Sequence, residues 1–399
     1  MVFVTSGERK RILILGSTGS IGRSACSCVR RFRERFEVAG LAAGSNIDLL
    51  AEQVTEFAPS AAYITAATNA DALRDRFGGN VKVYDGSDGA SGLERIVEEC
   101  DYDILLNALV GAVGFRPTVA ALKRGKRVAL ANKESLVIGG DYIRTIIGQN
   151  QRGAIPALLP IDSEHSAILQ CLPQGGADGS VESIIITASG GPFRNQPEEA
   201  LASVTPEQAL NHPTWSMGKK ITVDSSTLMN KGFEVIEAHH LFSLPYDKLR
   251  VCVHPQSIIH SLVEFHDGAV IAQLGLPDME LPIQYALSWP HRLPIGGKRL
   301  RLSDIRSLEF FEPDMGKFPC LSLCIEAGRI GGTAPAAVNA ANEVAVDLFL
   351  NKRIGFTDIA RIVESALKGH SPVKADSVEV IEGVDREVRE RVSRRDMVC

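Results

Sequence analysis

A short apolar run that ends in a glycine-rich turn constrains the fold of this chain more than any other feature. Residues 11–16 read Arg-Ile-Leu-Ile-Leu-Gly, which is typical of a buried strand in a parallel sheet. The sequence Gly-Ser-Thr-Gly-Ser-Ile-Gly covers residues 16–22, and a helical stretch then continues to about Arg35. Glycines between a strand and a helix allow the backbone to approach a pyrophosphate closely. Their position favours a nucleotide site, and a tight turn without a ligand is the alternative.

Strand-like and helix-like segments alternate through the first part of the chain. This alternation predicts an α/β domain with a largely parallel sheet. The expected strands are residues 38–43, 61–65, 81–84, 104–107 and 127–131, and the expected helices are residues 47–57 and 118–124.

The pattern changes after residue 150 or so. Strand-like runs at residues 183–188, 249–253, 257–265 and 270–274, with an Asp-Gly turn before the last, predict an antiparallel sheet in a second domain. Residues 289–315 are rich in Pro, Gly, Arg and Lys, as in a linker that crosses the surface. From Cys320 onward apolar residues recur at helical spacing, which predicts a helical domain at the end of the chain.

Composition narrows the class of protein. A chain of 399 residues exceeds the usual limit of a single core, so two or three domains are expected. A net charge of −5 gives no footprint for nucleic acid. The eight cysteines lack zinc-site spacing and predict free thiols in a reducing cytosol. We find neither the apolar core of a signal peptide nor a run long enough to span a membrane, so we expect a cytoplasmic enzyme.

Carboxylates among small polar residues are the clearest chemical signal. Asp162-Ser-Glu164 and the later run of residues 224–234 (DSSTLMNKGFE) combine carboxylates with serines, an asparagine and a lysine. Mg²⁺ and Mn²⁺ prefer oxygen ligands, and phosphate prefers hydroxyl and amide donors with a positive charge. The mixture predicts a divalent metal beside a phosphate, although any one carboxylate alone would be read as a surface charge.

The local geometry of these two segments can also be predicted. If the backbone is extended here, the side chains of Asp162 and Glu164 would point to the same face of the chain. Asp224 or Ser225 could cap a helix, on which Asn230 and Glu234 would share a face.

The end of the second predicted strand bears on the choice of cofactor. It reads Ala43-Gly44-Ser45-Asn46 and lacks the acidic residue that would hold a ribose 2′-hydroxyl. This absence argues against NAD and leaves room for a 2′-phosphate, to which Ser45 and Asn46 can offer hydrogen bonds.

Together, these motifs closely resemble the 1-deoxy-D-xylulose 5-phosphate reductoisomerase family. The matching segments run in the family's order through nearly the whole chain. They are residues 16–22 (GSTGSIG), 130–137 (LANKESLV), 160–165 (PIDSEH), 189–193 (SGGPF), 212–218 (HPTWSMG), 223–234 (VDSSTLMNKGFE), 254–260 (HPQSIIH) and 339–343 (NAANE).

The resemblance implies an α/β fold with a Rossmann-like NADPH-binding domain (1–160), an α+β catalytic domain (161–290), a linker (291–316) and a helical domain (317–399). It also implies the site. Metal ligands would be Asp162, Glu164 and Glu234, and these with Lys133 and His212 would be the catalytic residues. The substrate contacts would be Lys133, Ser163, Glu164, Ser189, His212, Trp215, Ser225, Asn230, Lys231 and Glu234, of which Ser189, Ser225, Asn230 and Lys231 would hold its phosphate. NADPH would contact Thr18, Gly19, Ser20, Ile21, Gly44, Ser45, Asn46, Asn132, Glu134 and Gly218.

Residues 212–218 resemble the flap that closes over the substrate in this family, with Trp215 and Met217 as apolar cover. Two positions depart from the family pattern. Ser45 stands where many members carry a lysine, which weakens the expected 2′-phosphate recognition, and Ser166 replaces a common asparagine.

The activity that the resemblance implies has two stages. The carbon skeleton of 1-deoxy-D-xylulose 5-phosphate rearranges with the help of Mg²⁺ or Mn²⁺, and NADPH then reduces the aldehyde to 2-C-methyl-D-erythritol 4-phosphate. A homodimer without nucleic-acid or membrane partners is expected. The alternatives are an NADP-dependent, metal-assisted dehydrogenase of another sugar phosphate and a catalytically silent homologue that binds nucleotide.

Overall fold

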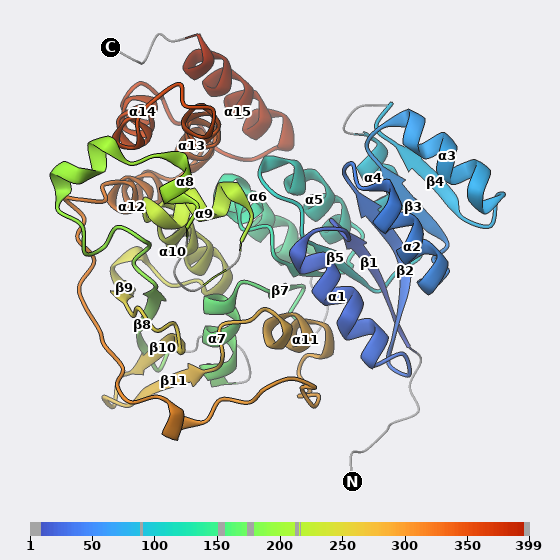
Figure 1. Cartoon of the computed structure of the whole chain (residues 1–399), viewed down its shortest axis with the longest axis horizontal. Coiled ribbons are helices and arrows are strands. Elements are labelled where there is room, and N and C mark those ends of the chain that lie inside the picture. Colours follow the sequence, from blue (N-terminus) through green and yellow to red (C-terminus); the bar gives the residue numbers. More distant parts are fainter. Residues whose placement is uncertain are drawn as a thin grey trace. The chain divides into compact units, whose positions relative to one another are not determined.

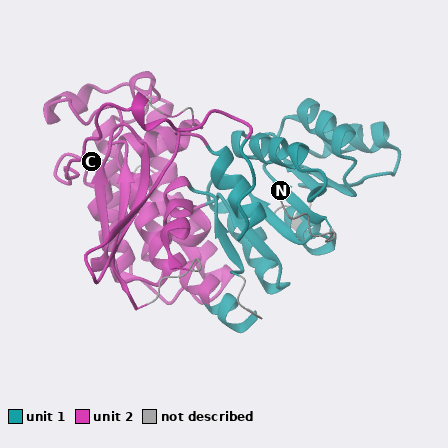
Figure 2. Ribbon diagram, turned by 90° about the horizontal axis from the view of Figure 1, so that it is seen from below, with its two compact units in different colours: residues 1–132, 145–162, 279–295 teal, residues 133–144, 163–278, 296–399 magenta. Residues whose placement is uncertain are grey.

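The computed structural model describes residues 9–87, 91–150, 156–173, 179–211, 215 and 217–394. Its contacts divide the chain into two compact units, shown in separate colours in Figure 2. Unit 1 comprises residues 1–132, 145–162 and 279–295, and unit 2 comprises residues 133–144, 163–278 and 296–399. The units interleave in sequence, whereas the division into four consecutive segments remains a prediction.

Unit 1 is built on a parallel sheet of seven strands. The strands are β1 (Lys10–Leu15), β2 (Phe36–Ala43), β3 (Ala61–Ile64), β4 (Lys82–Asp85), β5 (Ile104–Asn107), β6 (Arg127–Leu130) and β7 (Leu158–Pro160). Their order in the sheet is β4-β3-β2-β1-β5-β6-β7, and every pairing is parallel (Figure 1). The order reverses between β1 and β5, where α/β sheets of this kind bind ligands at the carboxyl ends of the strands. The predicted α/β domain with a parallel sheet is confirmed.

Helices connect these strands in the chain, and the apolar faces of the helices cover the sheet. They are α1 (Ser20–Arg31), α2 (Ile47–Phe57), α3 (Ala67–Phe77), α4 (Ser91–Glu99), η1 (Ala112–Gly114) and α5 (Phe115–Lys123). The later helix α11 (Glu280–Ser288) also belongs to unit 1, where Arg31 of α1 pairs with Glu280. Residues 12–15 of β1 are fully buried, which accounts for their uninterrupted apolar character.

Unit 2 contains a mixed sheet of four strands: β8 (Val181–Ala188), β9 (Leu249–Val253), β10 (Ile259–Phe265) and β11 (Val270–Leu274). The order is β11-β10-β8-β9, and β10 is antiparallel to both of its neighbours. β9 runs parallel to β8, so the prediction of an antiparallel sheet is wrong for this pair. About sixty residues, helices included, separate β8 from β9, and so long a connection permits a parallel crossover.

The remaining helices surround this sheet or form the carboxy-terminal part of unit 2. They are α6 (Glu134–Asn150), α7 (Ser163–Cys171), η3 (Glu198–Ser203), α8 (Pro206–Ala209), α9 (Lys219–Ser226), α10 (Met229–Phe242), η4 (Tyr246–Lys248), α12 (Cys320–Ile330), α13 (Ala334–Leu350), α14 (Phe356–Lys368) and α15 (Val378–Ser393). Helix α6 begins in unit 2 and ends in unit 1. Helix α13 packs against α12, α14 and α15, which confirms the predicted helical end of the chain.

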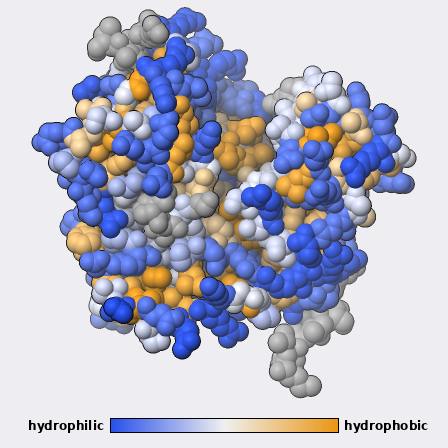
Figure 3. Space-filling view, viewed as in Figure 1, coloured by the Kyte–Doolittle hydropathy of each residue, from blue (hydrophilic) through white to orange (hydrophobic). Residues whose placement is uncertain are grey.

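The surface is that of a protein with its apolar side chains mostly inside. Hydrophilic residues cover much of the face drawn in Figure 3, with smaller hydrophobic patches between them.

Residues 296–319 contain little regular structure beyond η5 (Leu302–Asp304) and a bridge between Val253 and Phe311. Every cysteine in the described ranges is a free thiol, as predicted. None of the helices described here combines the length and the apolar character needed to cross a membrane.

Candidate active site

The glycine turn lies between β1 and α1, at the carboxyl edge of the unit 1 sheet. Gly16 has a φ of 82°, and a Cβ on it would lie 2.6 Å from the carbonyl oxygen of Ala108, directly after β5. A Cβ on Gly22 would lie 2.2 Å from the carbonyl oxygen of Gly16. Both positions therefore require glycine, because the backbones of the turn, the helix and β5 approach each other too closely for a side chain.

The start of α1 is suited to an anion. Within the described residues no side chain caps this helix, and its first turn contains no acidic residue. Its first N–H groups therefore remain available to a ligand, and the helix dipole favours negative charge there. The predicted cofactor contacts Thr18, Gly19, Ser20 and Ile21 lie in this turn and are exposed or half-buried.

The second predicted cofactor segment follows β2. Gly44, Ser45 and Asn46 are exposed, and the Asn46 side chain caps α2 by accepting a hydrogen bond from the N–H of Leu49 at 3.1 Å. Asn132 is only 1% exposed, and its amide donates to the carbonyl oxygens of Leu109 and Gly111 at 3.0 and 2.9 Å. Asn132 therefore braces the loop after β5 with its side chain.

Unit 2 holds a cluster of lysines and carboxylates between α7 and α10. Lys231 Nζ lies 2.9 Å from Glu164 Oε1 and also donates to Glu234 Oε2. Lys133 Nζ lies 3.2 Å from Glu234 Oε1 and 2.9 Å from Asn230 Oδ1. The predicted helical face is confirmed, because Asn230 Nδ2 donates to Glu234 Oε1 at 2.6 Å. The Glu234 side chain is 1% exposed, so these partners take the place of solvent around its oxygens.

The opposite charges govern the protonation state of this cluster. Burial by itself would lower the pKa of Lys231, but Glu164 and Glu234 outweigh it and raise the pKa. Lys231 is therefore a fixed positive charge inside the protein.

Asp162 completes a group of three carboxylates. One carboxylate oxygen each from Asp162, Glu164 and Glu234 lie within 4.8 Å of one another. Asp162 is bonded to Ser163, the first residue of α7, so its place beside Glu164 follows from the local chain. Three convergent carboxylates are the hard oxygen donors that Mg²⁺ and Mn²⁺ prefer, so the residues present fit a divalent cation.

The local geometry predicted for these residues needs two corrections. Glu164 lies in the first turn of α7, so Asp162 and Glu164 meet at a helix start and not along an extended strand. Asp224 and Ser225 occupy the last turn of α9, and the residue that precedes α10 is Leu228 in a left-handed conformation, so neither caps that helix.

The loop after β8 reaches the end of α9. Gly190 and Gly191 have φ values of 81° and 67°, and the Gly191 N–H donates to the hydroxyl of Ser189 at 3.3 Å. A Cβ on Gly191 would lie 2.9 Å from the carbonyl oxygen of Ser225. The structure thus brings together two predicted phosphate contacts, Ser189 and Ser225, which are far apart in sequence.

The predicted flap is only partly described. His212 lies outside the described residues. Trp215 is half-buried and its ring centroid lies 6.3 Å from that of His260, while Gly218 is exposed at the start of α9. Met217 of the flap is half-buried.

The predicted substrate contact Ser163 lies outside the flap, at the start of α7. Its hydroxyl donates to Glu164 Oε2 at 2.5 Å.

Asp224 forms a polar group beside this cluster with Lys220 and Asn342, two residues that were not predicted from the sequence. Lys220 Nζ lies 2.7 Å from Glu134 Oε1 and 2.9 Å from Asp224 Oδ2. Burial alone would raise the pKa of Glu134, but Lys220 outweighs burial and holds this pKa below its usual value. The only sequence signal was the matching segment of residues 339–343, to which no role was attached.

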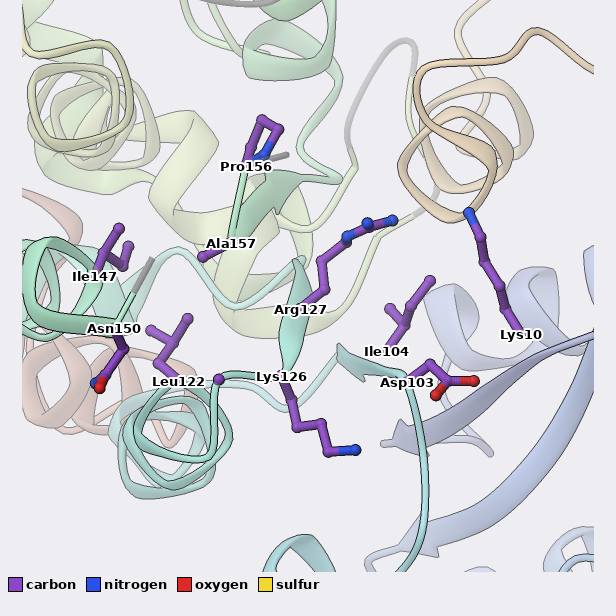
Figure 4. A pocket seen from close by; sticks show the side chains of 11 residues that line it. Lys10, Asp103, Ile104, Leu122, Lys126, Arg127, Ile147, Asn150, Pro156 and Ala157 are labelled. Atoms are coloured by element: carbon purple, nitrogen blue, oxygen red, sulfur yellow. The ribbon is translucent and has the colours of Figure 1, made fainter. Parts of the chain in front are cut away.

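A cavity in unit 1 lies at the edge of the sheet opposite the glycine turn. It measures about 300 Å³, and Lys10, Asp103 and Arg127 are among the residues that line it, with Lys10 and Arg127 extending toward the same helix (Figure 4). Its residues lie near the amino ends of β1, β5 and β6, whereas the glycine turn follows the carboxyl end of β1. The cavity is therefore separate from the turn that fits a nucleotide.

Comparisons with known proteins agree with this geometry. A family model described as 1-deoxy-D-xylulose 5-phosphate reductoisomerase matches residues 12–140, and models of the C-terminal domain of the same enzyme match residues 158–242 and 274–391. A 1-deoxy-D-xylulose 5-phosphate reductoisomerase of Chlorobium chlorochromatii is 51% identical over 96% of this chain and 98% of its own. That of Thermoanaerobacter pseudethanolicus is 49% identical over 97% of this chain and 100% of its own.

Solved structures are similar over the same length. The Zymomonas mobilis enzyme in complex with NADPH has a TM-score of 0.89 at 41% identity and covers 97% of this chain and 99% of its own. A reductoisomerase solved with NADPH, fosmidomycin and magnesium has a TM-score of 0.90 at 39% identity, with 97% and 98% covered.

Proposed function

This chain belongs to the 1-deoxy-D-xylulose 5-phosphate reductoisomerase family, and we propose that the lysine–carboxylate cluster between α7 and α10 is its catalytic centre. The reaction is the NADPH- and metal-dependent conversion of 1-deoxy-D-xylulose 5-phosphate to 2-C-methyl-D-erythritol 4-phosphate, in isoprenoid synthesis. The observation that carries the proposal is the convergence of Asp162, Glu164 and Glu234 beside two buried lysines.

Asp162, Glu164 and Glu234 are the proposed holders of the divalent cation. A bound cation supplies Lewis-acid polarisation of the substrate's carbonyl and hydroxyl oxygens. The carboxylates would hold that cation in place, and the lysines around them limit the negative charge of the cluster. The relative solved with NADPH, fosmidomycin and magnesium supports this part of the proposal.

The substrate is held by side chains on both sides of the cluster. Lys231 offers its fixed charge to the phosphate, with hydroxyl and amide donors from Ser189, Ser225 and Asn230. Ser163 and Lys133 are proposed to contact substrate oxygens next to the carboxylates. Trp215 and His212 of the flap are proposed to cover the substrate and exclude water during reduction.

NADPH is the proposed cofactor of unit 1, with its pyrophosphate on the glycine turn at the start of α1. It supplies the hydride for the reductive stage. The missing acidic residue after β2 supports a 2′-phosphate, which Ser45 and Asn46 would hydrogen-bond. Gly44, Asn132, Glu134 and Gly218 are further proposed contacts, and the relative solved with NADPH supports the choice of cofactor.

The proposal extends to properties of the whole protein. We expect Mn²⁺ to replace Mg²⁺ in the site, a homodimer in solution and a cytoplasmic location. Light scattering on a size-exclusion column tests the dimer, and a monomer at working concentration would reject it.

Turnover with defined substrates tests the function. NADPH absorbance is followed with 1-deoxy-D-xylulose 5-phosphate and Mg²⁺, then after EDTA and after renewed Mg²⁺. We expect oxidation that stops with EDTA and returns with metal. Folded, NADPH-binding protein that oxidises NADPH only with other sugar phosphates would indicate a different dehydrogenase. No oxidation with any of them would indicate a silent homologue.

A further inference from the structure

Lys220 is a partly buried cation shared by two buried carboxylates of different helices. It lies in the first turn of α9, and its amine lies 2.7 Å from Glu134 of α6 and 2.9 Å from Asp224 at the other end of α9. Both carboxylates are at least nine-tenths buried, at 9% and 1% exposed. The lysine therefore fixes the position of each carboxylate relative to the other, because neither has solvent to replace it.

Asn342 holds the same carboxylate from the carboxy-terminal helices. Its amide donates from the fully buried face of α13 to Asp224 Oδ1 at 2.8 Å. Lys220 and Asn342 thus bind the two oxygens of Asp224 separately. A buried carboxylate whose two oxygens are held by different elements has one orientation.

The neighbouring residue ties α13 to α15. Glu343 lies 2.6 Å from Arg389 of α15 and accepts from Asn339 at 3.0 Å. The carboxylate of Glu343 also contributes to the raised pKa of Lys220. The polar chain therefore runs from α15 through α13 to the end of α9.

What this chain orients is the proposed substrate site. Asp224 is followed directly by Ser225, whose carbonyl oxygen meets the loop of Ser189. Glu134 is preceded directly by Lys133, whose amine reaches Asn230 and Glu234. Ser225 and Lys133, the chain neighbours of Asp224 and Glu134, are proposed substrate contacts. A shift of either carboxylate would therefore also move the neighbouring substrate contact.

We propose that Asn342 is a positioning residue for substrate binding, which acts through Asp224 to place Ser225. The inference rests on the proposed function, because it assigns Ser225 to the substrate phosphate. It gives the helical end of the chain a part in catalysis beyond packing.

Steady-state kinetics of Asn342→Ala in the full chain tests the inference. We expect the KM for the substrate to rise about tenfold, the cost of one buried charge-assisted hydrogen bond, and the KM for NADPH to stay within about twofold. Asn351→Ala is the matched control, because Asn351 is the exposed residue directly after the same helix and donates to Asp347 Oδ1 at 3.1 Å. The control should leave both KM values unchanged.

A double-mutant cycle separates positioning from simple stability. If Asn342 acts through Ser225, Asn342→Ala should change the substrate KM little in a Ser225→Ala background. Thermal unfolding of each variant shows which are folded, and Asn342→Ser replaces Asn342→Ala if the latter does not fold. An unchanged substrate KM in active, folded Asn342 variants would overturn the inference, as would full additivity with Ser225→Ala. A wild type without turnover would instead reject the proposed function.

Discussion

The glycine turn of unit 1 and the lysine–carboxylate cluster of unit 2 are built in opposite ways. The turn is one contiguous segment, residues 16–22, whose binding groups are backbone N–H groups at the start of α1. The cluster is made of side chains, and Lys231 is 67 positions from Glu164 while Lys133 is 101 positions from Glu234. The turn depends on the absence of side chains, whereas the cluster depends on complete pairing of buried charges. Substitutions should therefore damage the two sites for different physical reasons.

Removing the charge of Lys231 should have the largest effect. Lys231→Met leaves Glu164 and Glu234 without that partner, and breaking a buried ion pair costs about 3–5 kcal/mol of unfolding free energy. Mg²⁺ should stabilise this variant more than wild type, because the cation replaces the lost charge. Denaturant unfolding with Mg²⁺ and with EDTA measures both effects. The control is Lys352→Met, whose pair with Glu207 is 66% exposed on both sides and should contribute less than about 1 kcal/mol. Equal unfolding free energies of Lys231→Met and wild type would mean that the cluster does not depend on the pairing of its buried charges.

Adding a methyl group to the turn should damage unit 1 by overpacking. In Gly22→Ala the new Cβ would meet the carbonyl oxygen of Gly16, and such insertions cost about 1–3 kcal/mol. NADPH binding should weaken with it, because the start of α1 must move. Gly148→Ala is the control, since Gly148 is exposed in α6 with open space around it. Calorimetric NADPH binding and denaturant unfolding give the result, and unchanged NADPH affinity in Gly22→Ala contradicts the account.

His240 is a buried histidine on α10, the helix that carries Lys231, and its burial affects the pH dependence of stability. Burial, with smaller contributions from His239 and Arg144, lowers the pKa of His240 from 6.5 to about 3, although Asp141 lies 3.9 Å away. The unfolded chain therefore binds this proton first, and stability falls as the pH drops below 6.5. The loss from this group is about 1.4 kcal/mol per pH unit, so about 2 kcal/mol at pH 5.

The pH prediction is checked by unfolding wild type and His240→Gln at pH 7 and pH 5. The variant should lose less stability than wild type over this interval, by about the amount assigned to His240. The same slope in His240→Gln as in wild type would contradict the assignment.

The smallest effect is expected at Ser45, where a charge is added to an exposed site. Ser45→Lys should tighten NADPH binding by roughly fivefold at most, which corresponds to about 1 kcal/mol for an exposed ion pair. NADH binding should change little, because it lacks the 2′-phosphate. Thr68→Lys, at an exposed position of α3, controls for net charge. Equal effects on NADPH and NADH would place the 2′-phosphate elsewhere.

Local features of the fold were predictable because their causes are local. The run of residues 12–15 is buried on both faces of a parallel sheet, so its apolar pattern alone identifies β1. The pair Asn230 and Glu234 follows from helical periodicity. The predicted direction of β9 was wrong. The direction depends on how the long connection from β8 packs, and hydrophobic periodicity does not encode that packing.

The sequence named several residues that the structure brings together, but it did not predict how they are arranged. Asp162 and Glu164 were placed on a strand because the spacing of two suits one, but Ser163 begins a helix. Asn342 was missed because its partner, Asp224, is 118 positions away, and Lys220 was missed because one of its partners, Glu134, is 86 positions away. Their role depends on burial and pairing, which appear only when α9, α10 and α13 pack together.

The proposal that the cluster between α7 and α10 binds a divalent cation is best tested by cation binding itself, because this measurement does not depend on substrate or turnover. Free Mn²⁺ is measured by electron paramagnetic resonance during titration of the full chain, as wild type, Glu234→Gln and the exposed control Glu207→Gln. The account predicts that Glu234→Gln weakens Mn²⁺ binding by at least about tenfold, the lower end of the loss known for outer-shell partners, while Glu207→Gln binds as wild type does. Equal Mn²⁺ affinity in wild type and a folded Glu234→Gln would mean that the cluster between α7 and α10 is not the metal site.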